Sequence, residues 1–127
     1  MDRQKLVLTA VGSHLLLTAL HALVHAAVPV IPNGWIAAFA TVSLYLLPVA
    51  GASLVVSGHR RVGAAVLLTS GIGSFVFEGA FHFMIDNPDH VEHVADHHAS
   101  FGVTAILTTL GNLLLIVAAW FSVRARQ

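Results

Sequence analysis

The chain alternates between long apolar stretches and short polar breaks. The apolar stretches cover residues 6–31, 35–58, 62–85 and 99–123. Glu78 is the only Asp, Glu, Lys or Arg residue within them. A helix needs about 20 predominantly apolar residues to cross the hydrocarbon core of a bilayer, and each stretch is long enough. The pattern therefore predicts an all-α fold, in which residues 1–127 form one integral membrane four-helix bundle with four transmembrane helices.

The breaks between the first three stretches carry residues typical of turns. In "VPVIPNGW", Pro29, Pro32 and Gly34 predict a tight reversal between the first two spans. The sequence "SGHRR" at 57–61 separates the second span from the third. Pro48 lies inside the second span and predicts a kink there, because proline removes one helical hydrogen bond and crowds the preceding turn.

The third break is longer and rich in acidic residues and histidines. In "IDNPDH", Asp86 or Asn87 suits a helix N-cap, and Pro88 suits the first helical position. We therefore predict that the polar segment 86–98 is helical and continuous with the last span.

Composition and charge support the membrane class and suggest an orientation. Only 9% of residues are charged, whereas soluble domains have about a quarter, and the mean hydropathy is +0.83. All basic residues flank the first, third or last span on one side: Arg3, Lys5, Arg60, Arg61, Arg124 and Arg126. The positive-inside rule then predicts cytoplasmic N- and C-termini in the plasma membrane, with the acidic, histidine-rich segment extracytoplasmic.

Several classes of function are excluded or disfavoured by composition. The chain has no cysteine, which excludes disulfides, thiolate zinc sites and cysteine-ligated iron–sulfur clusters. Its formal net charge is zero, so nothing indicates a nucleic-acid partner. We find no P-loop or dinucleotide glycine pattern. The predicted partner is the lipid bilayer.

Two of the predicted helices carry ionisable residues at helical spacing. In the first span, His14, His21 and His25 lie on one stripe, because they are seven and four residues apart. In the third span, Glu78 and His82 lie on one face, which Asp86 continues. Ionisable residues at membrane depth are costly to bury, and they are therefore candidates for function.

The two stripes are predicted to overlap in depth. With 1.5 Å of rise per residue, His21 and His25 lie roughly 4 and 10 Å to the outer side of the span centre. Glu78 and His82 lie roughly 7 and 13 Å to the same side. Imidazole and carboxylate ligands suit Zn, Fe, Cu(II) or Mn. We therefore predict a transition-metal site in the outer half of the bundle.

The candidate metal ligands fall into two ranks. The stronger candidates are His21, His25, Glu78, His82, His97 and His98. The weaker candidates are Asp86, His93 and His14. If the site is a hydrolytic or oxidative enzyme centre, Glu78 is the candidate catalytic base or a further ligand.

Two other functions fit the same residues. Haem b is the main alternative cofactor, because two histidines on facing helices of a bundle can ligate iron axially, as in an electron-transfer cytochrome. His21 or His25 would pair with His82, His97 or His98. A proton-linked or pH-sensing protein without metal is a further alternative, because histidines titrate near neutral pH.

Two histidine-rich motifs resemble those of a known family. "HALVH" at 21–25 and "HVADHH" at 93–98 resemble the HxxxH and HxxxHH boxes of membrane fatty-acid desaturases and hydroxylases, whose histidines hold two irons. The chain lacks a third box and is much shorter than members of that family. The resemblance therefore implies only that such spacings can build an iron or zinc site.

Small residues form a further face on the third span. Ser70, Gly71, Gly73 and Ser74 allow close approach of another helix. This face suits packing within the chain or against a second copy, so a homo-oligomer is a possible assembly.

Overall fold

The computed structural model describes residues 2–28, 33–94 and 97–124, and this part of the chain consists of helices and turns. The elements are α1 (Arg3–Ala27), α2 (Gly34–Ala40), the π-helix η1 (Thr41–Leu46), α3 (Leu47–Val56), α4 (Arg60–Phe83) and α5 (His98–Val123). Because α2, η1 and α3 follow one another directly, they form one helix, Gly34–Val56. Within the described residues, four helices are thus long and apolar enough to span a membrane.

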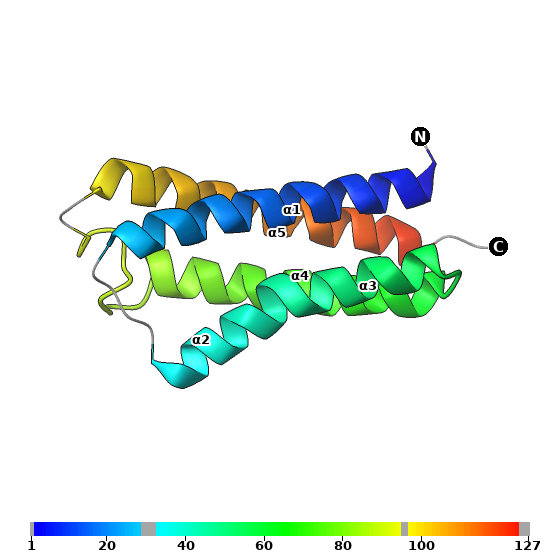
Figure 1. Cartoon of the computed structure of the whole chain (residues 1–127), viewed down its shortest axis with the longest axis horizontal. Coiled ribbons are helices and arrows are strands. Elements are labelled where there is room, and N and C mark those ends of the chain that lie inside the picture. Colours follow the sequence, from blue (N-terminus) through cyan, green and yellow to red (C-terminus); the bar gives the residue numbers. More distant parts are fainter. Residues whose placement is uncertain (1, 29–32, 95–96, 125–127) are drawn as a thin grey trace.

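The helices form a bundle from which α2 diverges (Figure 1). α5 packs against both α1 and α4, and α3 packs mainly against α4. α2 makes its main contacts with η1. The start of α1, the end of α5 and the α3–α4 turn lie at one end of the bundle (Figure 1). We call this the basic end, and the opposite end, with residues 84–94, the histidine end.

Short polar side chains define two of the helix starts. The Asp2 carboxylate accepts a hydrogen bond from the Gln4 N–H (3.1 Å), and the Asn33 side chain accepts one from the Ile36 N–H (3.2 Å). Both satisfy amide groups that have no partner within the helix. The predicted reversal at Pro29 and Pro32 lies outside the described residues.

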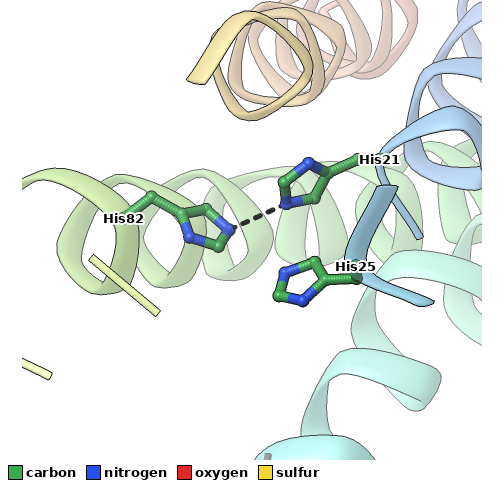
Figure 2. Close-up of side chains that lie close together, drawn as sticks. All are labelled: His21, His25 and His82. Atoms are coloured by element: carbon green, nitrogen blue, oxygen red, sulfur yellow. Dashed lines mark hydrogen bonds between the residues drawn. The ribbon is translucent and has the colours of Figure 1, made fainter. Parts of the chain in front are cut away.

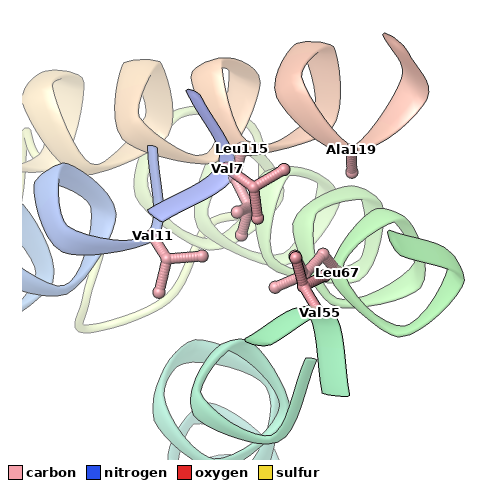
Figure 3. Close-up of a cluster of buried hydrophobic side chains, with 6 residues drawn as sticks. All are labelled: Val7, Val11, Val55, Leu67, Leu115 and Ala119. Carbon is pink, nitrogen blue, oxygen red and sulfur yellow. The ribbon is translucent and has the colours of Figure 1, made fainter. Parts of the chain in front are cut away.

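The core at the basic end is apolar. Its buried side chains come from α1, α3, α4 and α5 (Figure 3): Val7, Val11, Val55, Leu67, Leu115 and Ala119. The cluster fills the bundle between the basic end and the ionisable residues farther along it.

Glycines bring neighbouring helices close together. A Cβ added at Gly63 would lie 2.6 Å from the Gly51 carbonyl oxygen, so α3 and α4 pack at backbone distance. A Cβ added at Gly71 would lie 2.9 Å from Cγ1 of Ile116 on α5. The structure thus uses Gly71, from the predicted small-residue face, for packing within the chain.

Pro48 determines the geometry of the second long helix. The residues before it, Thr41–Leu46, form a π-helix, and the Leu47 N–H bonds to the Val42 carbonyl five residues back. Because Pro48 has no N–H, it donates to no carbonyl of the preceding turn. Single π-helical turns of this kind occur often at functional sites.

Side chains from other helices satisfy two carbonyls of the π-helix. His14 Nε2–H on α1 donates to the Leu44 carbonyl (2.9 Å). The Ser70 hydroxyl on α4 donates to the Ser43 carbonyl (2.6 Å). Unpaired buried carbonyls are costly, so these two bonds stabilise the irregular turn and fix α3 between α1 and α4.

The prediction that residues 86–98 form a helix continuous with α5 is wrong. Residues 84–94 form turns instead, organised by the Asn87 side chain. Its amide N–H groups donate to the carbonyls of Phe81 (2.8 Å) and Ile85 (2.6 Å), and its oxygen accepts from the Asp89 N–H (2.8 Å). Asparagine bonds of this kind compete with helix formation and favour turns.

α5 therefore starts later than the sequence indicates. It begins at His98, and His97 before it has a left-handed backbone with φ of 62°. Histidine is among the residues that tolerate this conformation. The left-handed turn separates the polar segment from α5, so Pro88 is a turn residue and not the first residue of a helix.

We expect Gly63→Ala to lower the thermal stability of the protein in detergent. The added methyl group meets backbone atoms that cannot move as a flexible side chain would, and overpacking of this kind costs about 1–3 kcal/mol. Gly12→Ala is the matched control, because nothing lies within 4 Å of a Cβ at Gly12. Equal melting temperatures for the two variants would contradict the close α3–α4 contact.

Candidate metal centre

Three histidines meet at the histidine end of the bundle. His21 and His25 lie one turn apart on α1, and His82 lies near the end of α4 (Figure 2). One ring nitrogen from each lies within 4.8 Å of the other two. Only 4% of His21 and 2% of His82 is exposed. The three residues form a group that is positioned to hold a metal ion.

Phe101 on α5 covers the group from one side. It is fully buried, and its ring centroid lies 4.9–5.4 Å from those of His21, His25 and His82. An apolar ring at this position keeps water from that side of the imidazoles. Such a shell also controls solvent access to a metal site.

The environment of His82 determines which of its nitrogens carries hydrogen. Its Nδ1 lies 2.9 Å from the backbone carbonyl oxygen of Asp89, which can only accept. Nδ1–H is therefore the donor, and in the neutral ring Nε2 has a free lone pair. The turn that brings Asp89 back onto α4 also joins the Val91 N–H to the His82 carbonyl (3.0 Å).

A hydrogen bond also determines which ring nitrogen of His21 carries hydrogen. Its Nδ1 lies 2.9 Å from the Thr104 hydroxyl oxygen on α5. The single hydroxyl hydrogen of Thr104 has the carbonyls of Ser100 (2.8 Å) and Phe101 (3.1 Å) as acceptors, and when it is donated to either one, the hydroxyl oxygen accepts from His21 Nδ1–H. Nε2 of the neutral His21 ring therefore also has a free lone pair.

The free electron pairs point toward one another. His21 Nε2 lies 3.1 Å from His82 Nε2, and Glu78 Oε2 lies 3.1 Å from the same His82 atom. With both rings protonated at Nδ1, no hydrogen lies between these three acceptors. Glu78 Oε2 is buried and has no hydrogen-bond partner among the described residues. A cation between the three atoms, either a metal ion or a proton on His82 Nε2, would remove this conflict.

The Asp89 carboxylate lies near both His25 and His82. It is 3.3 Å from His25 Nε2 and 3.6 Å from His82 Nδ1. Burial raises the pKa of this carboxyl group, and the neighbouring imidazoles act in the opposite direction. Contacts of this type orient histidine ligands in metal sites.

The distances fit two ligands of one small ion. At metal–nitrogen distances of 2.0–2.1 Å, tetrahedral ligand nitrogens lie about 3.4 Å apart. The 3.1 Å between His21 Nε2 and His82 Nε2 is close to this value. Two axial ligands on opposite sides of an iron would be about 4 Å apart at the same bond length.

The structure does not bring all predicted ligands to this group. His97 and His98 are exposed at the start of α5. Asp86 and His93 form their own pair (3.4 Å), with 92% and 47% of their side chains exposed. His14 bonds to the π-helix and lies outside the group of three.

Three residues around the histidines were missed by sequence reasoning. Asp89 lies in the segment wrongly predicted as helix, where it would extend away from α4. Phe101 and Thr104 are ordinary residues of an apolar span and show no distinctive spacing. The one sequence signal was Asn87, which favours turns as well as helix N-caps. A turn at Asn87 would have indicated that Asp89 folds back onto α4.

A second set of buried polar atoms extends from Glu78 toward the middle of the bundle. His14 Nδ1, Thr18 Oγ1, Ser74 Oγ and both amide atoms of Asn112 have no hydrogen-bond partner among the described residues. Buried polar atoms of this kind are usually satisfied by ordered water.

No protein-family model matches the chain, and neither a curated protein nor a solved structure matches it.

We expect His21 and His82 to be neutral and protonated at Nδ1 in the purified protein at pH 8. Two-bond ¹H–¹⁵N correlation spectra of selectively labelled histidine distinguish this form from the Nε2–H form. The exposed His59 provides a reference. An Nε2–H form of either His21 or His82 would contradict the arrangement described above.

Proposed function

We propose that the chain is an integral membrane protein that holds one transition-metal ion at His21, His25 and His82. The observation that carries this proposal is the convergence of His21 Nε2, His82 Nε2 and the buried Glu78 carboxylate, with both contacts of His82 Nε2 at 3.1 Å. Two hydrogen bonds strengthen the proposal. His21 and His82 each donate their other N–H to a fixed oxygen, as metal-bound histidines generally do.

Zinc is the metal that this ligand set favours. Three histidines with one open position form a known catalytic zinc site, and a carboxylate can fill the fourth position in a closed site. Fe(II), Mn(II) and Cu(II) accept the same donor types. Because the described contacts provide no sulfur, they favour these ions over Cu(I).

The arrangement supports hydrolytic chemistry in particular. A metal ion at such a site polarises a carbonyl group and lowers the pKa of water toward neutrality. Glu78 lies beside His82 Nε2 and can accept a proton there. Phe101 packs against His82 and restricts water there. In the hydrolytic form of this proposal water takes the fourth position, Glu78 is the general base, and Asp89 positions His25 and His82.

Haem is less well supported. Axial ligands would need a separation of about 4 Å with a flat ring between them. His21 and His82 Nε2 are 3.1 Å apart, and the ring of Phe101 lies against both imidazoles. A bis-histidine haem would therefore require the two helices to separate.

The proposal places the metal in the outer half of a bilayer. Large apolar side chains are exposed around the bundle, including Leu16 (62%), Leu23 (69%) and Val76 (61%), as expected for contact with lipid. All described basic residues lie at the basic end, which the positive-inside rule assigns to the cytoplasm. The histidine end would then be extracytoplasmic.

We expect the detergent-purified protein to contain about one transition-metal ion per chain. His21→Ala and His82→Ala should each reduce the metal content to background, because each removes a ligand and leaves its hydrogen-bond partner unpaired. Inductively coupled plasma mass spectrometry measures the metal, and an absorption spectrum of the same sample tests for haem.

His98→Ala is the matched control, because this exposed histidine should be dispensable for metal binding. Full metal content in both ligand variants would refute the site. A Soret band lost in those variants would identify haem instead. A wild-type protein that stays free of metal after reconstitution would favour the proton-linked function.

We also expect the two ends to react differently with a membrane-impermeant maleimide. The chain has no cysteine, so single cysteines can be introduced by Glu92→Cys at the histidine end and Ser57→Cys at the basic end. In intact cells only the Glu92→Cys variant should be labelled, while permeabilised cells should label both. Labelling of Ser57→Cys alone would reverse the proposed orientation.

A further inference from the structure

A cavity of about 490 Å³ opens beside the three histidines. Its walls come from α1, α2, η1 and α4, together with Asp89 of the turn segment. The volume falls within the range of about 300–1,000 Å³ that is typical of small-molecule sites. The cavity therefore has room for a ligand that reaches the proposed metal.

The divergence of α2 creates this space. α2 makes its main contacts with η1 and leaves the bundle toward the histidine end (Figure 1). Alanines line both sides of the resulting gap: Ala37 and Ala40 on α2, and Ala22 and Ala26 on α1. Short side chains at these positions leave the gap unfilled. The π-helix before Pro48 thus shapes the cavity beside the site as well as the fold.

The cavity is polar at one end and apolar along α2. Its polar end consists of the three histidines, Glu78 and Asp89. Elsewhere its lining is largely apolar, with Ile36 and Phe77 among the larger side chains. The Tyr45 hydroxyl also faces this region, but it donates to the Thr18 carbonyl (3.3 Å). A fitting ligand has one polar group and one apolar segment.

The surroundings indicate where such a ligand comes from. The cavity lies between helices that are long and apolar enough to span a membrane, and exposed Trp35 (62%) and Phe39 (39%) extend the apolar surface of α2. These apolar surroundings favour an amphiphile from the bilayer over a water-soluble ligand. The limited volume of the cavity favours an amphiphile with one hydrocarbon chain over one with two.

We propose that this cavity binds a single-chain acyl lipid, with its carbonyl head group at the histidines and its chain along α2. The proposal rests on the metal centre described above, because a metal ion there attracts a carbonyl or carboxylate oxygen. It names the class of substrate on which a hydrolytic centre would act: a single-chain acyl ester or amide.

Two hydroxamates test the proposal on the zinc-loaded protein in detergent. Acetohydroxamate and decanohydroxamate carry the same metal-binding head group, but only the second has a long chain. We expect decanohydroxamate to bind at least about tenfold more tightly, because burial of several methylene groups is favourable. Isothermal titration calorimetry in one fixed detergent measures both affinities.

Substitutions of the α2 residues that line the cavity test where the acyl chain binds. Ala37→Phe should abolish the chain-length gain while acetohydroxamate affinity and zinc content stay unchanged, and Ala40→Leu is a second, milder variant. Ala38→Phe is the matched control on the same helix, because Ala38 is exposed and does not line the cavity. It should keep the gain.

The possible outcomes separate this inference from the metal site. If both hydroxamates bind equally to the wild type, or if the gain survives in Ala37→Phe and Ala40→Leu, the acyl-chain proposal is overturned while the metal site stands. If acetohydroxamate does not bind and the protein holds no zinc, the metal centre itself fails, and the inference fails with it.

Discussion

Buried polar groups in an apolar bundle must find their partners inside the protein, and most of this structure follows from that constraint. Pro48 removes one backbone donor from the second long helix, and the resulting π-helix presents carbonyls that require new donors. His14 and Ser70 supply them from two other helices. The irregular turn therefore fixes the position of α3 while it lets α2 diverge.

The same constraint defines the candidate metal centre. The Asp89 carbonyl and the Thr104 hydroxyl each occupy the Nδ1 of one histidine, which leaves the Nε2 atoms of His21 and His82 as acceptors. Glu78 adds a third acceptor with no donor among the described residues. Three acceptors at about hydrogen-bond distance are unfavourable unless a cation lies between them. A metal ion bound there, as proposed, would satisfy all three, as would a proton on His82 Nε2.

The two ends of the bundle differ in a way that bears on function. At the basic end, Val7, Leu67 and Leu115 belong to an apolar core, and Gly63 holds α3 at backbone distance from α4. Toward the histidine end, buried ionisable side chains lie beside a second apolar cluster of Val28, Val94 and Phe101, and α2 leaves a cavity. The arrangement suits a site that is reached from one side of the membrane or from the lipid.

The sequence by itself determined the four long apolar helices, the His21/His25 stripe and the matching depth of His82, because helical periodicity and hydrophobic length are local properties. Tertiary structure decided the rest. Asn87 ends α4 with side-chain hydrogen bonds, so the turn brings Asp89 to the site and the exposed His97 and His98 stay outside it. Such contacts depend on how the chain folds back in space, and residue spacing along one helix carries no information about them.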